Sequence, residues 1–501
     1  MRCFFRRAFS CRYYHQLRVF LIAGEPSGDV IGSRLMASLN QLHPFGLKFA
    51  GVGGPLMEKQ GLTSEFPMDD LSVMGALELL PHLFKLRARL KQTLVAAEIF
   101  QPDIVVAIDS KGFSFRVLKQ LRAKCMEQQR NIPLSILYVA PSVWAWKGGE
   151  RQLWKWIGIV DHILCILPFE ESLCKQNGLA ATFVGHPALE DAFFDSNRAN
   201  SWTLKWHIEG DKKNFFSSHG LPEGTTLLSL LPGSRLQEVK RMMPIYRETL
   251  EILKDDICNL TVTIPTTFSS QLIQKIENEI TKWDIPVVLL PGATLKQKYD
   301  AFNASVVGLC TSGTIVLQMQ LARLPCVVAY RANTITEWLV KRSTQLRYMS
   351  LPNILLDAPI IPEAALSDCT PSRLAEMLRR LLCDDALRQE QIFAAEKIIC
   401  LPTMFLYRVK QWSHVFRATE FLKPFKKLEY TASVCLSPSK VQSKCRHSAI
   451  LKLDTVVHII WLQDDKSSAS LFKKEKHVDT VAHSSEKRVE ISMGQLQRTK
   501  N

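Results

Sequence analysis

The sequence predicts an α/β fold of two similar halves, each built on a parallel β-sheet with helices on both faces, with a cleft between the halves. Short apolar runs alternate with helical patterns along most of the chain. Each run ends in Gly, Pro, Ser or Asp, the residues that form turns after buried strands. The alternation loosens over residues 195–222 and then resumes, which indicates a second α/β unit after the first.

The expected strands follow one another at regular intervals. In the first half they are Val19–Ala23, Lys48–Gly54, Asp103–Asp109, Leu134–Trp146, Asp161–Pro168 and Ala181–Pro187. In the second half they are Leu227–Arg235, Leu260–Thr266, Ile285–Gly292, Ser305–Thr314 and Leu324–Arg331. The predicted domains are therefore residues 18–194 and 223–400, and the polar residues 195–222 form a linker or a surface insertion between them.

The two ends of the chain differ from these domains. Residues 1–17 are rich in arginine and aromatic residues, and no acidic residue occurs before Glu25, which is typical of an organelle presequence. Serine is sparse there, so a mitochondrial destination is favoured over a chloroplast; a merely basic tail is the alternative. Residues 401–501 are basic and rich in Ser and Lys, and they predict a poorly ordered, divergent tail.

Composition excludes several classes of protein. The formal net charge is +15, which suits an anionic substrate or membrane surface, but no nucleic-acid-binding motif accompanies it. No apolar run reaches the ~18 residues of a spanning helix, so we expect membrane contact to be peripheral. The 13 cysteines contain no CxxC pair or zinc-like spacing, which favours reduced thiols and no metal site.

Two strand ends in the second half are candidate anion sites. Thr311 to Thr314 form a small turn before a helix, where backbone N–H groups and the helix dipole favour a phosphate; an ordinary Ser/Thr cap is the alternative. Arg235 follows Gly233 and Ser234 and suits a diphosphate, or it is a surface residue of a turn. Gly292, at a third strand end, could wall a base.

Acidic residues follow two strands of the first half. Asp109 ends a buried strand, where its carboxylate could take a proton from a hydroxyl group; a helix cap or a turn residue is the alternative. Glu25 and Asp29 lie in the turn GEPSGD. Because a helical pattern follows Asp29 directly, we expect Asp29 to be a helix cap.

The segment Leu71–Leu94 is apolar in its first part and basic in its second. Such a segment can insert apolar side chains into an anionic bilayer while its cations meet the headgroups. An amphipathic helix that packs on the sheet is the alternative.

The motifs GEPSGD, GVGGPLM, LSVMG, the strand ending at Asp109, YVAPSVWAW, LPFE, VGHP, LLPGSR, SGT, VAYR and SLPN occur in this order. Together they resemble the lipid-A-disaccharide synthase family, over roughly residues 18–400, and the chain is similar to a plant organellar member. The resemblance implies a GT-B fold, with two Rossmann-like domains facing a central cleft. It implies transfer of 2,3-diacylglucosamine from its UDP derivative to 2,3-diacylglucosamine 1-phosphate (lipid X), peripheral to the membrane, with no cofactor or metal.

The resemblance also implies roles for individual residues. Asp109 matches the family's essential carboxylate and is expected to be the base, with Glu25 as an auxiliary carboxylate or acceptor contact. The candidates for binding UDP and its diphosphate are Gly233, Ser234, Arg235, Gly292, Ser312, Gly313, Thr314 and Gln318. The candidates for acceptor or membrane contact are Gly24, Ser27, Gly28, Met74, Leu77, Leu79, Leu80, Leu83, Trp144 and Trp146. Further candidates for the cleft are His186, Arg331 and Asn353.

Two departures from the family's pattern affect the site. Gln318 stands where related transferases often carry a Glu for the ribose hydroxyls, and the lost charge could cost the donor about 1 kcal/mol of binding. Bacterial members usually carry a second Asp three residues after the first, and here that position is Gly112. A nucleotide-sugar epimerase and a catalytically weakened nucleotide-sugar or lipid-binding protein are the alternative functions. A homodimer is compatible with the sequence.

Overall fold

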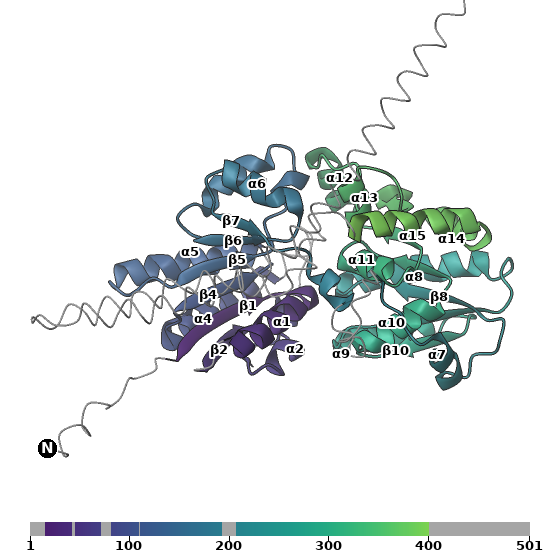
Figure 1. Cartoon of the computed structure of the whole chain (residues 1–501), viewed down its shortest axis with the longest axis horizontal. Helices are drawn as coiled ribbons and strands as arrows, with labels where there is room; N and C mark the ends of the chain where they lie inside the picture. Colours follow the sequence, from purple (N-terminus) through teal and green to yellow (C-terminus); the bar gives the residue numbers. More distant parts are fainter. Residues whose placement is uncertain (1–15, 43–45, 72–81, 110, 193–206, 400–501) are drawn as a thin grey trace, which may run out of the picture. The chain divides into compact units, whose positions relative to one another are not determined.

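The computed structural model describes residues 16–42, 46–71, 82–109, 111–192 and 207–399, and these contain two parallel β-sheets (Figure 1). In both sheets the strand order, renumbered within the sheet, begins 3-2-1-4-5-6, which is the Rossmann order. The prediction of an α/β protein with two Rossmann-like domains is therefore confirmed. Among the described helices, none combines the length and the apolar character that crossing a bilayer requires.

The first sheet has the order β3-β2-β1-β4-β5-β6-β7. Its strands are β1 (Leu17–Ala23), β2 (Leu47–Val52), β3 (Thr63–Ser64), β4 (Ile104–Ile108), β5 (Leu134–Tyr138), β6 (His162–Cys165) and β7 (Ala181–Phe183). Every residue of β4 is buried, as expected for a central parallel strand covered on both faces.

Helices cover both faces of the first sheet because successive side chains of a strand point to opposite faces. Val105 and Ala107 of β4 join the core formed with α4 (Leu83–Phe100) and α5 (Lys111–Glu127). Ile108, on the alternate face, contacts α1 (Pro26–Leu42) at Gly28 and Gly32. The remaining elements of this half are α2 (Pro55–Glu58), α6 (Pro168–Gln176) and the short 3-10 helices η1 (Met68–Asp70), η3 (Val143–Ala145), η4 (Gly149–Trp156) and η5 (Pro187–Ala192).

The second sheet has the order β10-β9-β8-β11-β12-β13. Its strands are β8 (Thr226–Leu231), β9 (Leu260–Pro265), β10 (Val287–Leu290), β11 (Val307–Cys310), β12 (Cys326–Tyr330) and β13 (Glu363–Ala365). Leu228 and Leu230 of β8 face the core under the helices at Leu236–Leu253, Ser270–Ile280 and Pro371–Cys383. Leu227 and Leu231 join two smaller clusters that contain residues of the helices at Lys212–Ser218, Leu295–Ala304 and Thr314–Leu321.

The helices of the second half follow the strands in alternation. They are α7 (Lys212–Ser218), α8 (Leu236–Leu253), α9 (Ser270–Ile280), α10 (Leu295–Ala304), α11 (Thr314–Leu321), α12 (Thr334–Ser343), α13 (Leu351–Leu356), α14 (Pro371–Cys383) and α15 (Asp385–Ile399), with the 3-10 helix η7 at Leu366–Asp368. Several begin at a side-chain cap; Thr294, for example, forms a capping box with Gln297 at the start of α10.

Two features of the fold differ from the expectations. The strands β3 and β13 span two and three residues, too few to show a period in the sequence. Within the expected linker, residues 212–218 form α7, and Phe215 of this helix is buried against the second sheet. The domain boundaries themselves stay a prediction.

Candidate functional site

The loops predicted to carry chemistry follow the strands at which each sheet reverses its strand order. In the first sheet these strands are β1, followed by the GEPSGD turn, and β4, followed by Asp109. In the second they are β8, followed by Gly233 to Arg235, and β11, followed by Thr311 to Thr314. In open α/β sheets, ligands bind beyond the carboxyl ends of the strands at such switch points.

Asp29 is a structural carboxylate, as expected, but it caps a different helix. Its side chain is buried and accepts hydrogen bonds from the backbone N–H groups of Gly54, Leu56 and Met57, at 2.9–3.1 Å. These groups lie at the start of α2, so Asp29 ties the GEPSGD turn to the loop after β2 rather than capping α1. Its pKa is raised because burial outweighs these three bonds.

Asp109 lies in a strained turn. Its backbone is left-handed, with a φ of 52°, and so is that of Val139 after the neighbouring strand β5, with a φ of 76°. This conformation is costly for a β-branched residue and tends to occur at functional sites. The Asp109 N–H donates to the Tyr138 carbonyl at 3.0 Å and its carbonyl accepts from Ser114 Oγ at 2.9 Å, while its side chain stays half-buried.

Arg235 connects the two switch points. Its Nη2 lies 2.6 Å from Glu25 Oε2, and its Nη1 lies 2.6 Å from Glu238 Oε1. Glu238 lies in the first turn of α8, directly after Arg235, and its other oxygen accepts from the backbone N–H groups of Ser234 and Arg235. Glu25 comes from the opposite sheet. The structure therefore brings together two residues that the sequence predicted separately.

The charged side chains around this ion pair shift the pKa values of Glu25 and Arg235. The pKa of Glu25 is raised, first by burial and further by the negative charges of Asp109 and Glu238, while Arg235 lowers it. Although burial alone would lower the pKa of Arg235, the two carboxylates raise it above its ordinary value. A buried guanidinium between two carboxylates stays charged.

The two turns of the second sheet that were predicted to bind anions each contain a glycine with a left-handed backbone. Gly233 and Gly313 have φ values of 118° and 125°, which residues with a Cβ rarely adopt. Helix α11 begins at Thr314 and its N-cap residue is Gly313, without a side-chain cap, so the alternative of an ordinary Ser/Thr cap is not what the structure has. Ser312 Oγ instead reaches the Met349 carbonyl at 3.5 Å.

Gly292 lies beside two residues that sequence reasoning missed. Its N–H donates to Thr266 Oγ1 at 3.0 Å, and a Cβ at this position would lie 2.7 Å from the Phe268 ring. Phe268 is 46% exposed, and Lys59 Nζ lies 5.5 Å from the centre of its ring. The only signal in the sequence was that Thr266 ends a predicted strand and Phe268 follows it.

Gln318 is a member of a buried polar network. Its Nε2 donates to Asp191 Oδ2 at 2.8 Å, and its Oε1 accepts from Lys298 at 3.3 Å. Asp191 also accepts from Tyr299 and forms an ion pair with Arg34 of α1. Asp191, which accepts the hydrogen bond from Gln318, is 127 residues away in the sequence, so no local pattern could have revealed this pairing.

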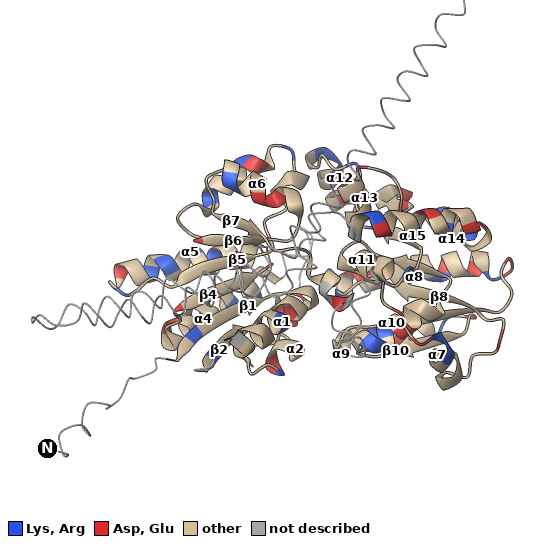
Figure 2. Cartoon of the chain, viewed as in Figure 1, with Lys and Arg blue, Asp and Glu red and all other residues tan. Residues whose placement is uncertain are grey.

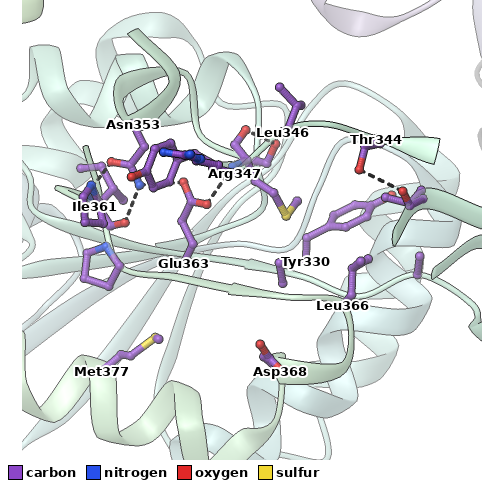
Figure 3. A pocket seen from close by; sticks show the side chains of 18 of the residues that line it. Tyr330, Thr344, Leu346, Arg347, Asn353, Ile361, Glu363, Leu366, Asp368 and Met377 are labelled. Atoms are coloured by element: carbon purple, nitrogen blue, oxygen red, sulfur yellow. Dashed lines mark hydrogen bonds between the residues drawn. The ribbon is translucent and has the colours of Figure 1, made fainter. Parts of the chain in front are cut away.

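The three further candidates for the cleft make contacts within the protein. His186 is buried and its pKa is lowered to about 4 by burial, so it is neutral at pH 7. Arg331 lies 3.2 Å from Glu337 and donates to the Cys369 carbonyl. Asn353 donates to Glu363 and accepts from the Ile361 N–H, as Figure 3 shows. Their ligand-binding roles stay predictions.

A large cavity lies beside the second sheet. It has a volume of about 1380 Å³, and Arg235 and Ser312 are among its lining residues. Figure 3 shows the part of its lining that includes Tyr330. Trp146 also lines it and is 40% exposed. Trp144, in contrast, packs edge-on against Phe169 and donates to the buried Glu170.

The predicted membrane segment is only partly described. Met74, Leu77, Leu79 and Leu80 lie outside the described residues. Leu83 and Phe84, at the start of α4, are 47% and 88% exposed. Around GEPSGD, Gly24 and Gly28 are buried and Ser27 is half-buried.

Two Rossmann sheets with carboxylates at one switch point and an arginine with two glycine turns at the other are typical of nucleotide-dependent α/β enzymes. The family model "Lipid-A-disaccharide synthetase" matches residues 19–405. The chain is 51% identical over 389 residues to "Probable lipid-A-disaccharide synthase, mitochondrial" of Arabidopsis thaliana, covering 77% of this chain and 84% of the relative. It is 44% identical over 376 residues to the lipid-A-disaccharide synthase of Rhodospirillum centenum, covering 75% and 88%.

The chain therefore belongs to the lipid-A-disaccharide synthase family. Its activity is that of a lipid-A-disaccharide synthase, a glycosyltransferase of lipid A biosynthesis. This decides against the epimerase and the weakened binding protein.

Solved structures of low sequence identity also align. The UDP complex of MnaA from S. aureus gives a TM-score of 0.49 at 13% identity, over 78% of this chain and 97% of that one. The calicheamicin glycosyltransferase CalG4 gives 0.46 at 12% identity, over 82% and 98%.

Proposed function

We propose that the chain transfers 2,3-diacylglucosamine from its UDP derivative to the 6-hydroxyl of 2,3-diacylglucosamine 1-phosphate (lipid X). The new bond joins the acceptor oxygen to the anomeric carbon of the donor with inversion, and the bond from that carbon to the diphosphate breaks. The acceptor hydroxyl loses a proton, and UDP leaves with the electron pair. The products are a β(1→6)-linked, acylated disaccharide phosphate and UDP.

The observation that carries this proposal is the ion pair of Glu25 and Arg235, which links the acidic loops of one sheet to the anion seats of the other. Asp109 accepts the acceptor proton, because it is a half-buried carboxylate at the switch point of the first sheet. Arg235 and the N–H groups of the Ser312 to Thr314 turn neutralise the charge that develops on the departing diphosphate.

The position of Glu25 adds an order to these events. A diphosphate that binds Arg235 competes with the Glu25 carboxylate for the Nη2 group. Glu238 does not have to move, because it bonds the other nitrogen of Arg235 and the backbone of the loop before α8. Donor binding thus frees Glu25 on the side of the site where Asp109 and the acceptor lie.

The enzyme is proposed to act at a mitochondrial membrane. The arginine-rich N-terminal residues and the named localisation of the Arabidopsis relative support the compartment. Leu83 and Phe84 at the start of α4, followed by Lys85 and Arg87, support contact with an anionic lipid surface. A homodimer is compatible with this proposal and is not required by it.

A product analysis tests the proposed reaction. The purified chain is incubated with UDP-2,3-diacylglucosamine and lipid X, and UDP and disaccharide are measured together. We expect equal amounts of both, with a β configuration in the anomeric proton coupling, and no product from an acceptor that lacks the 6-hydroxyl. A product with an α linkage, or UDP release without disaccharide, would contradict the proposed reaction.

A further inference from the structure

Helix α12 exposes its apolar residues and buries its acid, the reverse of an ordinary surface helix. Ile335, Trp338 and Leu339 are 55%, 61% and 40% exposed. Glu337 is 7% exposed and lies 3.2 Å from Arg331, which holds it inside the fold. Surface helices of globular proteins face their apolar side inward, so this arrangement indicates that α12 meets an apolar partner.

The charges around these residues are positive. Lys341 and Arg342 in the last turn of α12 are exposed, and the Arg342 guanidinium lies 5.7 Å from the centre of the Trp338 ring. Lys147 of the first half donates to the Arg342 carbonyl at 3.0 Å. Glu337 is the one acid of this helix and is buried, so α12 presents cations to its surroundings, as Figure 2 shows in blue.

The exposed apolar residues continue into the cavity of the candidate site. Trp146, 40% exposed, forms a β-bridge with Thr344 directly after α12, and Leu346 two residues further on is 37% exposed. Trp146, Leu339 and Leu346 line the same cavity as Arg235 and Ser312. A molecule held at the diphosphate seat can therefore extend apolar groups toward α12.

We propose that the α12 surface, defined as Ile335, Trp338, Leu339, Leu346 and Trp146, docks on an anionic lipid bilayer, and that the cavity behind it takes acyl chains of the membrane-held substrate. Trp338 suits the boundary between headgroups and acyl chains, since it joins a large apolar ring to a polar N–H. Lys341 and Arg342 suit lipid phosphates. The acyl-chain part of this inference rests on the proposed function; the bilayer part does not.

A second copy of the chain is the other occupant to consider. In a two-fold dimer the same surface patch meets itself, which would bring Lys341 and Arg342 of one copy toward those of the other. Phosphate headgroups neutralise these cations, whereas a second copy repeats them. The charge of the surface therefore favours the bilayer.

Vesicle flotation tests the docking. The full chain is mixed with vesicles of phosphatidylcholine containing phosphatidylglycerol, and the bound fraction of wild type is compared with that of I335S/W338S. Because two exposed apolar side chains no longer enter the bilayer, we expect the apparent partition coefficient to fall at least about tenfold. R342E should lose binding to the anionic vesicles and not to vesicles of phosphatidylcholine alone.

A matched control and a second assay keep the result specific. Phe393 of α15 is 57% exposed and carries Lys397 over its ring at 4.5 Å, as Trp338 carries Arg342, so F393S should float like wild type. Turnover of water-soluble, short-chain substrate analogues should stay within about twofold of wild type in I335S/W338S, since these residues do not line the cavity. Turnover of long-chain substrates in vesicles should fall with the flotation.

Three results would overturn the inference. They are unchanged flotation of I335S/W338S, an equal loss in F393S, and a shift of I335S/W338S from dimer to monomer in light scattering with flotation intact, which would assign the surface to a second copy. If wild type floats but turns over no acylated substrate, the proposed function fails while the docking stands.

Discussion

The two sheets share a strand order and differ in what they place at the switch point. The first presents the carboxylates Glu25 and Asp109, and the second presents Arg235 and two glycine turns. Parallel topology thus determines where a site lies, and the residues of a few loop positions determine its charge. The difference suits a transfer reaction, because a hydroxyl must lose a proton on one side while a diphosphate gains charge on the other. Glu25 and Arg235 join the two sides.

The largest effect is expected at the acidic switch point. Asp109→Asn keeps the shape of the side chain and removes the proton acceptor, so we expect kcat to fall by about 10²–10⁴. UDP affinity, measured by calorimetry, should stay within about twofold of wild type, because the anion seats belong to the other sheet. If Asp109→Asn turns over like wild type, another group is the base.

The next effect is expected at the basic switch point. Arg235→Gln removes the charge that faces Glu25 and the proposed diphosphate, and a charge-assisted hydrogen bond of this kind contributes about 1.5–3 kcal/mol. UDP binding should therefore weaken by roughly 10- to 100-fold. Arg379→Gln is the matched control, because Arg379 pairs with Asp256 on the surface of the second half, away from the cavity, and its loss should leave UDP affinity unchanged. Equal weakening in both variants would count against the seat.

These two loops were predictable from the sequence because their residues follow buried strands directly. The strand before Asp109 reads as a continuous apolar run, and the SGT and GSR turns stand at strand ends. Contacts between distant residues were not predictable. Asp191, whose carboxylate accepts a hydrogen bond from Gln318, is 127 positions away, and neither local sequence contains a pattern that predicts the pairing. Asp29 was correctly expected to be a cap, but its partner helix starts beyond the next strand, where only the fold brings it close.

Within the six residues GEPSGD, Asp29 is expected to contribute to stability and not to catalysis. Asp29→Ala would leave the buried N–H groups of Gly54, Leu56 and Met57 without this acceptor. We expect the free energy of unfolding to fall by roughly 2–3 kcal/mol. Chemical denaturation of Asp29→Ala and Asp29→Asn measures this, and Asn should cost less because its carbonyl keeps one acceptor oxygen. A fall in kcat without a fall in stability would instead make Asp29 part of the chemistry.

Substitution of Glu25 is expected to give the smallest effect, and to increase UDP affinity rather than decrease it. Glu25→Gln removes a carboxylate that competes with the diphosphate for Arg235, so UDP should bind about 3- to 10-fold tighter than to wild type, since a partly exposed ion pair contributes about 1 kcal/mol.

The advantage of Glu25→Gln over wild type should shrink as pH falls. The pKa of Glu25 is raised by burial and by Asp109, so wild-type Glu25 becomes protonated at a higher pH than an ordinary glutamate and then no longer competes for Arg235. Calorimetry of both proteins from neutral to mildly acidic pH measures the ratio of their affinities, in which the protonation of UDP itself cancels. A ratio below one, with weaker binding in Glu25→Gln, would mean that Glu25 supports the donor rather than competing with it, and the two switch points would then act as one seat.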